Sequence, residues 1–153
     1  FRIKGLGITQ NNNTNMVIAV DFDGTIVETS LPGYRQGNTF ATATLKRLVE
    51  HGHRLIRGVC ARASCWTKRN WCKERGVEFY AVNKDFYEET KEANKHYSRK
   101  LKADVFIDDR NLGGLPDWGM IYQIIMEHKT YEQCLMERMG QPVSKRKKPW
   151  WKF

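Results

Sequence analysis

Four residues between positions 21 and 25 have the types and spacing of a metal or phosphate site. Asp21 and Asp23 are two residues apart, so in an extended chain their carboxylates point to the same side. Carboxylates placed in this way can share one divalent cation or meet one phosphate group. Gly24 permits a sharp turn directly after them, and Thr25 adds a hydroxyl group. The segment therefore has the composition of a site for a hard cation and a phosphate.

A second acidic pair, Asp108 and Asp109, follows the apolar run 105–107, much as Asp21 follows the apolar run 16–20. Short runs rich in Val and Ile are typical of buried strands in a parallel sheet, whose binding sites lie at the carboxyl ends of the strands. Either pair alone could simply cap a turn or a helix. Because both pairs follow strands, we expect them to meet at one edge of a sheet.

The chain resembles the haloacid dehalogenase (HAD) superfamily of hydrolases. Asp21-Phe-Asp-Gly-Thr25 matches motif one of that superfamily, and Ile107-Asp-Asp-Arg-Asn111 matches its motif four. The resemblance covers residues 16 to about 139 and is greatest to small, capless hydrolases of bacterial or phage type. It implies an α/β fold with a doubly wound, Rossmann-like, mainly parallel sheet and helices on both faces. Residues 29–38 are too few for an inserted domain, so we expect a minimal cap.

The resemblance also implies roles for the residues of motif one. In that superfamily the residue matching Asp21 attacks a phosphoryl group and forms an aspartyl-phosphate, which water then hydrolyses. The residue matching Asp23 acts as general acid and then as general base. Gly24 and Thr25 would contact the phosphate. The activity implied is hydrolysis of phosphate monoesters.

Magnesium is the implied cofactor, because a cation must offset the repulsion between carboxylates and a phosphate. The residues assigned to the metal shell are Asp21, Asp23, Asp108 and Asp109. A lysine upstream of motif four matches motif three, which neutralises the phosphoryl group. We prefer Lys100 in this catalytic role, because the resemblance is to an Arg-Lys-x-x-Ala-Asp arrangement. Lys102 stays the alternative, since spacing alone does not fix the choice.

The resemblance fails at motif two. The superfamily places a Ser or Thr at the end of its second strand, but here Arg57 and Gly58 interrupt the apolar run and Ser64 lies well past it. A shift of reading frame would explain this difference. One set of codons for the peptide Leu-Trp-Ser-Val-Arg-Glu-Gly-Glu-Leu-Leu-Asp-Glu-Ala encodes the residues Arg57 to Arg69 once a single T is deleted. We hypothesise that residues 57 to about 70 are out of frame. As written, the chain lacks one donor to the phosphoryl group, worth about 10²- to 10³-fold in rate. The alternative function is therefore a catalytically impaired protein that binds a phospholigand or a nucleic acid.

The remaining pattern predicts one domain and its elements. Residues 1–15 are predicted to be a disordered leader, with Met16 as the natural start, and residues 16–140 to be the hydrolase domain. Apolar residues at 41, 45, 48 and 49 predict a helix that ends at Gly52. A third strand is expected over 77–82, with further helices over 119–127 and 131–139. Residues 84–96 fit either a loop or a short helix.

The net charge of +9 comes from three basic segments of the chain. Residues 1–15, 57–70 and 144–153 hold eleven basic side chains and no acidic ones, so the rest of the chain is slightly acidic. The tail, residues 141–153, combines cations with aromatic rings and offers a possible nucleic-acid contact, although disorder is the expected state of such a terminus. The expected partner is a phosphorylated substrate, either a small molecule or a polynucleotide end. No membrane span or signal peptide is visible and the cysteines lack metal-ligand spacing, so we expect a cytoplasmic protein with free thiols.

Overall fold

The computed structural model describes residues 15–28, 37–58, 65–84, 90 and 101–142. Several predictions fall outside these residues. They concern the leader up to residue 14, most of the loop 29–38, Ser64, Lys100, most of the segment 84–96, and the tail from residue 143. All of these stay predictions.

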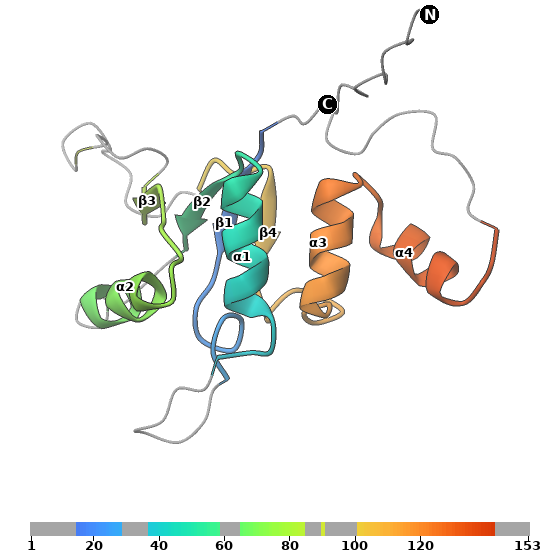
Figure 1. The fold of residues 1–153 in the computed structure, drawn as a ribbon, viewed down its shortest axis with the longest axis horizontal. Helices are drawn as coiled ribbons and strands as arrows, with labels where there is room; N and C mark the ends of the chain where they lie inside the picture. The colour runs from blue at the N-terminus through green and yellow to red at the C-terminus, as the bar shows by residue number, and fades with distance from the viewer. Residues whose placement is uncertain (1–14, 29–36, 59–64, 85–89, 91–100, 143–153) are drawn as a thin grey trace, which may run out of the picture.

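Four parallel strands form the sheet: β1 (Val17–Val20), β2 (Arg54–Arg57), β3 (Ala81–Val82) and β4 (Val105–Ile107). Their order in space is β3-β2-β1-β4, and each neighbouring pair is parallel (Figure 1). The chain moves outward from β1 to β3 and then crosses back to place β4 on the other side of β1. The predicted α/β class with a Rossmann-like parallel sheet is thus confirmed. Ligands of such sheets bind where the strand order reverses, which here is between β1 and β4.

The register makes β2, β1 and β4 end level with one another. Val20 lies opposite both Arg57 and Ile107, the last residues of β2 and β4. At the other end, the backbone N–H of Val17 donates to the Asp104 carboxylate at 2.7 Å. The residues that follow β1 and β4 therefore leave the sheet side by side.

Within the described residues, four helices accompany the sheet: α1 (Ala41–Glu50), α2 (Cys65–Glu74), α3 (Trp118–Met126) and α4 (Tyr131–Arg138). Helix α1 lies along the sheet with α3 beside it, and α4 packs on the far side of α3 (Figure 1). One buried cluster joins these helices to the strands, and it includes Ile18, Val20, Leu55, Ile107, Leu45, Leu48, Cys72, Ile121 and Ile125. The residues that alternate with them along the strands, Ala19, Ile56 and Ala81, are buried as well. The sheet is therefore buried on both faces at β1 and β2.

Local signals explain where the helices begin and end. Gly52 follows α1 with a φ of +90°, as expected for a residue that ends a helix. The Asp117 carboxylate caps α3 by accepting from Met120 N–H at 2.9 Å, and it also binds Arg138 of α4. Thr130 and Gln133 form a reciprocal capping box at the start of α4.

Two expectations need correction. The third strand covers only Ala81–Val82 instead of 77–82. Val77 is buried in the core and its N–H donates to Cys72 O, so residues 77–80 lead from the end of α2 to the sheet. Val49 was expected on the buried stripe of α1 but is 38% exposed, because Leu45 and Leu48 already fill the contact with the core.

None of the helices within the described ranges combines the length and the apolar character needed to cross a membrane.

Candidate metal and phosphate site

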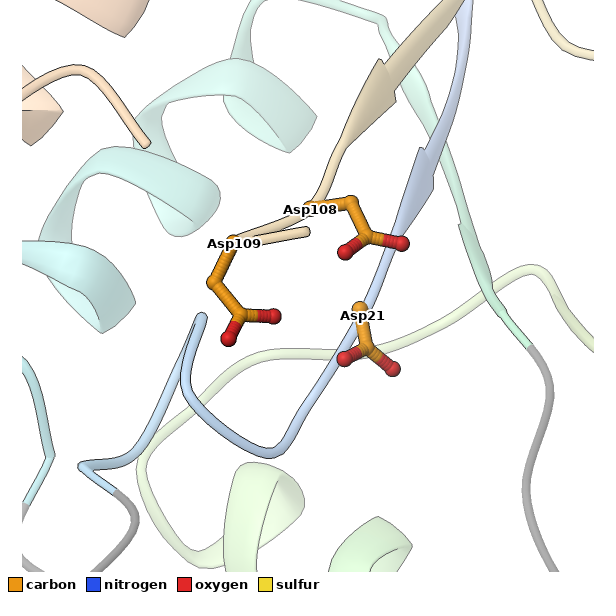
Figure 2. A group of neighbouring side chains, drawn as sticks. All are labelled: Asp21, Asp108 and Asp109. Carbon is orange, nitrogen blue, oxygen red and sulfur yellow. The ribbon is translucent and has the colours of Figure 1, made fainter. Parts of the chain in front are cut away.

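Three carboxylates converge at the carboxyl edge of the sheet. Asp21 follows β1, and Asp108 and Asp109 follow β4 (Figure 2). One oxygen from each of the three lies within 4.8 Å of the others. The parallel pairing of β1 with β4 produces this approach, and a hydrogen bond from Asp21 N–H to Ile107 O at 2.9 Å continues it past the strand ends. The predicted meeting of the two acidic pairs is therefore confirmed for these three residues.

The hydroxyl group of Thr25 holds Asp109 in place through a hydrogen bond. The threonine is fully buried, and its Oγ1 accepts from Asp109 N–H at 3.0 Å. The same hydroxyl lies 3.5 Å from Asp109 Oδ1, at the limit for a hydrogen bond. Thr25, expected to contact phosphate, thus has its hydroxyl engaged with the acidic loop. Its role in this structure is to join the motif-one loop to the end of β4.

Gly24 is required at its position for two reasons. Its φ is +81°, a backbone conformation that side-chain-bearing residues rarely adopt. A Cβ atom there would also lie 2.3 Å from Asp109 Oδ2. Around it the chain turns tightly, with Gly24 N–H donating to Val27 O at 2.8 Å and Asn38 Nδ2 donating to Thr25 O at 2.6 Å. Gly24 therefore lets the Asp109 carboxylate approach the motif-one backbone.

The carboxyl group of Asp21 experiences an unfavourable environment for its charge. Burial raises its pKa, and the neighbouring Asp108, Asp109 and Asp23 raise it further, while the Phe22 backbone N–H lowers it. Desolvation is the largest of these effects, the hydrogen bond from the Phe22 backbone N–H is the next, and repulsion from the other carboxylates follows. A divalent cation would offset both the desolvation of the carboxylate and the repulsion from its neighbours. Three oxygen ligands of this kind fit Mg²⁺, which prefers carboxylates and water.

Asp23 lies apart from this cluster, although it was expected in the metal shell. Its carboxylate forms an ion pair with the ammonium of Lys68 on α2. The side chain of Asp23 is 43% exposed, whereas that of Lys68 is 8% exposed. The ion pair therefore joins a buried ammonium to a partly exposed carboxylate. Asp23 does not belong to the group of described carboxylates that could share one ion.

Aromatic packing places Lys68 against Asp23. The rings of Phe22 and Trp71 meet edge to face with centroids 5.6 Å apart, and Cys72 beside Trp71 is fully buried in the core. Trp71 and Lys68 are three residues apart on α2, so they lie on the same side of that helix. The Lys68 ammonium also lies 5.4 Å from the centre of the Phe22 ring. The contact between Phe22 and Trp71 thus sets the position of the lysine.

The structure brings Asp21, Asp108 and Asp109 together, with Gly24 and Thr25 supporting them. Lys100 lies outside the described residues, and its alternative Lys102 is exposed just before β4. Sequence reasoning missed Lys68 as a site residue, because it lies in the segment 57–70, which we interpreted as out of frame. The sequence did contain a signal for it. Lys68 and Trp71 are three residues apart, the spacing of neighbours on one side of a helix, and the segment 57–70 holds no acidic residue that could pair with the lysine locally.

The fold and the site define a class of protein: a parallel α/β sheet with a carboxylate cluster at the point where the strand order reverses. No family model and no curated protein matches the chain. The chain is similar to a solved structure, that of a conserved protein from Bacteroides thetaiotaomicron. The two sequences are 52% identical, the match covers 77% of this chain and 95% of that chain, and the TM-score is 0.69. The chain therefore belongs to the same family as that conserved bacterial protein.

Proposed function

We propose that this chain is a Mg²⁺-dependent phosphate monoester hydrolase of the HAD type, and thus an enzyme that works through an aspartyl-phosphate on Asp21. The observation that carries the proposal is the convergence of Asp21, Asp108 and Asp109 at the carboxyl edge of the sheet. Motif one and motif four, which are distant in the sequence, supply these residues. A structural acidic turn would not need both strands to deliver acids to one point.

The geometry divides the acidic residues into two groups with different chemistry. Asp21, Asp108 and Asp109 would hold the magnesium ion, which supplies charge neutralisation for a phosphate dianion when bound. Asp23 stands outside the cluster with its carboxylate partly exposed. A group in this position suits proton transfer with a leaving oxygen or with water.

The reaction follows in two displacements. An Asp21 oxygen attacks phosphorus, the bond from phosphorus to the leaving oxygen breaks, and Asp23 gives its proton to that oxygen. Water then attacks the phosphorus of the aspartyl-phosphate, and Asp23 takes the proton of the water. The bond between phosphorus and Asp21 breaks, which releases inorganic phosphate and restores the carboxylate.

The alternative function is binding without turnover, through loss of the motif-two donor. It agrees with the absence of a Ser or Thr at the end of β2, where Arg57 and Gly58 stand. The nucleic-acid contact expected of the tail concerns residues outside those described. Substrate size stays open between a small phosphate ester and a polynucleotide end.

The test is phosphate release from p-nitrophenyl phosphate with Mg²⁺ and with EDTA. We expect Mg²⁺-dependent turnover that Asp21→Asn abolishes, since an amide is a poor nucleophile. Glu28→Gln serves as the matched control, because Glu28 is an exposed acid in the same loop. A chain carrying the restored Leu-Trp-Ser-Val-Arg segment should turn over faster by about 10²- to 10³-fold if motif two was lost.

The outcomes separate the two functions. Turnover that survives Asp21→Asn would contradict the proposed mechanism. Binding of phosphate analogues without turnover, in the chain as written and in the restored chain, would support the binding function.

A further inference from the structure

Phe40 is an exposed aromatic residue whose presence the fold does not explain. It occupies the N-cap position of α1, where Ser, Thr, Asp or Asn ordinarily accepts hydrogen bonds from the first N–H groups of a helix. A phenyl ring cannot accept such bonds, and Phe40 is 71% exposed. Phe40 therefore contributes neither a side-chain cap to the helix nor a buried side chain to the core.

The backbone of Phe40 is also strained. Its φ is +66°, in the left-handed region that is unfavourable for a residue with a Cβ atom. The neighbouring Asn38 is tied to the motif-one turn, because its N–H donates to Ile26 O at 2.8 Å and its side-chain amide donates to Thr25 O at 2.6 Å. Glycine would adopt the positive φ without strain. Strained backbone of this kind is concentrated at functional sites.

A second exposed apolar side chain lies on the segment that carries the other acidic pair. Leu112 comes three residues after Asp109, in the loop that follows β4. Phe40 is linked to the same carboxylate from the motif-one side, since Asn38 binds Thr25 O and the Thr25 hydroxyl accepts from Asp109 N–H. Among the described residues, Leu112 and Phe40 are the two most exposed large apolar side chains. Both belong to segments that are joined to the carboxylate cluster.

We propose that Phe40 and Leu112 contact the leaving group of the substrate, and that the substrate is a phosphate ester whose leaving group carries an apolar ring. The inference rests on the proposed function. The phosphoryl group is the same in every phosphate monoester, so discrimination among esters depends on side chains that contact the leaving group. An aromatic side chain favours a ring in the ligand through apolar contact and through ring-to-ring packing.

The strained backbone of Phe40 suits this contact. The hydrogen bonds of Asn38 hold the chain beside Phe40, so the ring extends from a fixed support. Ordering a side chain on binding opposes association, and an aromatic side chain with two torsions loses little freedom when a ligand packs against it. The strain therefore disfavours the free protein slightly and keeps an exposed ring beside the site.

The experiment measures the Kd of phenylphosphonate and of methylphosphonate by isothermal titration in the presence of Mg²⁺. Both compounds have the same phosphonate group, and they differ in the ring. We expect the wild type to bind phenylphosphonate more tightly than methylphosphonate. Phe40→Gly should raise the Kd of phenylphosphonate by roughly 3- to 10-fold, as expected for the loss of one aromatic contact, and should leave the Kd of methylphosphonate unchanged.

Phe40→Gly should bind less tightly although it is the more stable protein. Its melting temperature should rise by about 2–4 °C, because glycine relieves the strain and little buried surface is lost. Unfolding therefore cannot account for the weaker binding. Phe40→Tyr keeps the ring and should keep the wild-type Kd values. Leu112→Ser should weaken the binding of phenylphosphonate alone, without a change in melting temperature.

Met139→Ser is the matched control. Met139 is 67% exposed, close to the value for Phe40, but it follows α4, which packs on the far side of α3 (Figure 1). Its replacement should leave both Kd values unchanged. A loss of phenylphosphonate binding in this variant would mean that the ring binds to exposed apolar residues in general, which would overturn the inference.

Three further outcomes would overturn the inference. Equal Kd values of the two phosphonates in the wild type would mean that no apolar contact reaches the leaving group. Equal increases of both Kd values in Phe40→Gly would mean that Phe40 acts on the phosphate site. A lower melting temperature of Phe40→Gly would mean that the ring has a structural role.

Failure of the proposed function has a different result. The wild type would then bind phenylphosphonate selectively but release no phosphate from p-nitrophenyl phosphate, which leaves the contact in place in a binding protein. A wild type that binds neither phosphonate would contradict both the proposed function and this inference.

Discussion

Gly24 shows how a single backbone conformation controls the carboxylate cluster. Its positive φ and its 2.3 Å approach to Asp109 Oδ2, measured from a Cβ built at this position, both exclude a side chain. The carboxylate of Asp109 occupies the space that a methyl group would take. The observed position of the Asp109 carboxylate therefore requires glycine at residue 24.

Gly24→Ala should weaken metal binding more than it weakens the fold. The left-handed conformation costs about 1–2 kcal/mol for a residue with a Cβ, and the methyl group must also displace Asp109. Isothermal titration with Mg²⁺ or Mn²⁺ would measure the loss of affinity. Gly113→Ala is the matched control, since its φ is +92° but nothing lies within 4 Å of its Cβ position. Equal metal affinities in the two variants would contradict a role for the contact with Asp109.

His53 links stability to pH through a buried hydrogen bond. Its Nδ1 accepts from Met16 N–H at 3.2 Å, which requires that this nitrogen carry no proton. Burial lowers its pKa below the ordinary 6.5, and nearby His128 and His51 lower it further. Between the folded and unfolded pKa values the unfolded chain binds the extra proton, so stability rises with pH.

The free energy of unfolding should therefore be constant above about pH 7 and fall as the pH drops below 6.5. Urea unfolding at a series of pH values would measure this slope. His53→Gln should reduce it, with the remainder due to His128, whose pKa burial also lowers. The control His51→Gln, at an exposed position, should leave most of the slope in place. An unchanged slope in His53→Gln would contradict the assignment.

At the scale of the elements, β2 contains an unexpected buried charge. Arg57 ends the strand opposite Val20 and is 1% exposed. It points to the same face of the sheet as Leu55, because residues two apart in a strand share a side. The hypothesised shift of frame begins at this residue and would place a leucine there.

Arg57→Leu should lower the free energy of unfolding by about 3–5 kcal/mol, because removing one member of a buried charged contact leaves its partner uncompensated. Guanidinium chloride unfolding would measure the change. The control Arg54→Leu alters an exposed arginine at the start of the same strand and should change stability by less than about 0.5 kcal/mol. A gain of stability in Arg57→Leu would contradict a structural function of the guanidinium in this chain.

The sequence predicted the strands and helices that have strong local patterns. β1 and β4 were found because apolar runs end at acidic residues, and α1, α3 and α4 were found because their apolar spacing is helical. The third strand was predicted too long, since alternation at 77–82 reflects burial of Val77 and Ala81 and not pairing along the whole segment. Periodicity reports which side chains are buried, whereas pairing depends on the neighbouring strand.

The candidate site was predicted in part. Asp21, Asp108 and Asp109 could be placed together because parallel strands bring their carboxyl ends to one edge. The separation of Asp23 from them could not, since it depends on Lys68, which reaches the site through the packing of α2 on Phe22. The support of Asp109 by Thr25 was likewise hidden, because the two residues are 84 positions apart.

For the molecule as a whole, the carboxylate cluster is a source of repulsion that a cation would convert into stabilisation. A ligand that binds only the folded state stabilises it by about 2.7 kcal/mol at one hundred times its dissociation constant. The melting temperature of the wild type should therefore rise with Mg²⁺ and fall with EDTA. Scanning calorimetry would measure both.

The variant Asp108→Asn separates the repulsion among the carboxylates from the stabilisation by a bound cation. It removes one negative charge, so the melting temperature in EDTA should be higher than that of the wild type, while the response to Mg²⁺ should largely disappear. The control Glu132→Gln changes an exposed acid of α4, far along the chain from the cluster, and should keep the wild-type response. A full Mg²⁺ response in Asp108→Asn would contradict this site for the ion.

The position of β4 beside β1 also determines when the site can exist during synthesis. β1, α1 and β2 are close in sequence and can pair as soon as they leave the ribosome, but β4 must close a loop of more than eighty residues to reach the same strand. The three carboxylates therefore meet only after the long-range pairing has formed. A nascent chain that ends before residue 105 contains Asp21 but no cluster. The carboxylate cluster is thus completed late, as a property of the finished sheet.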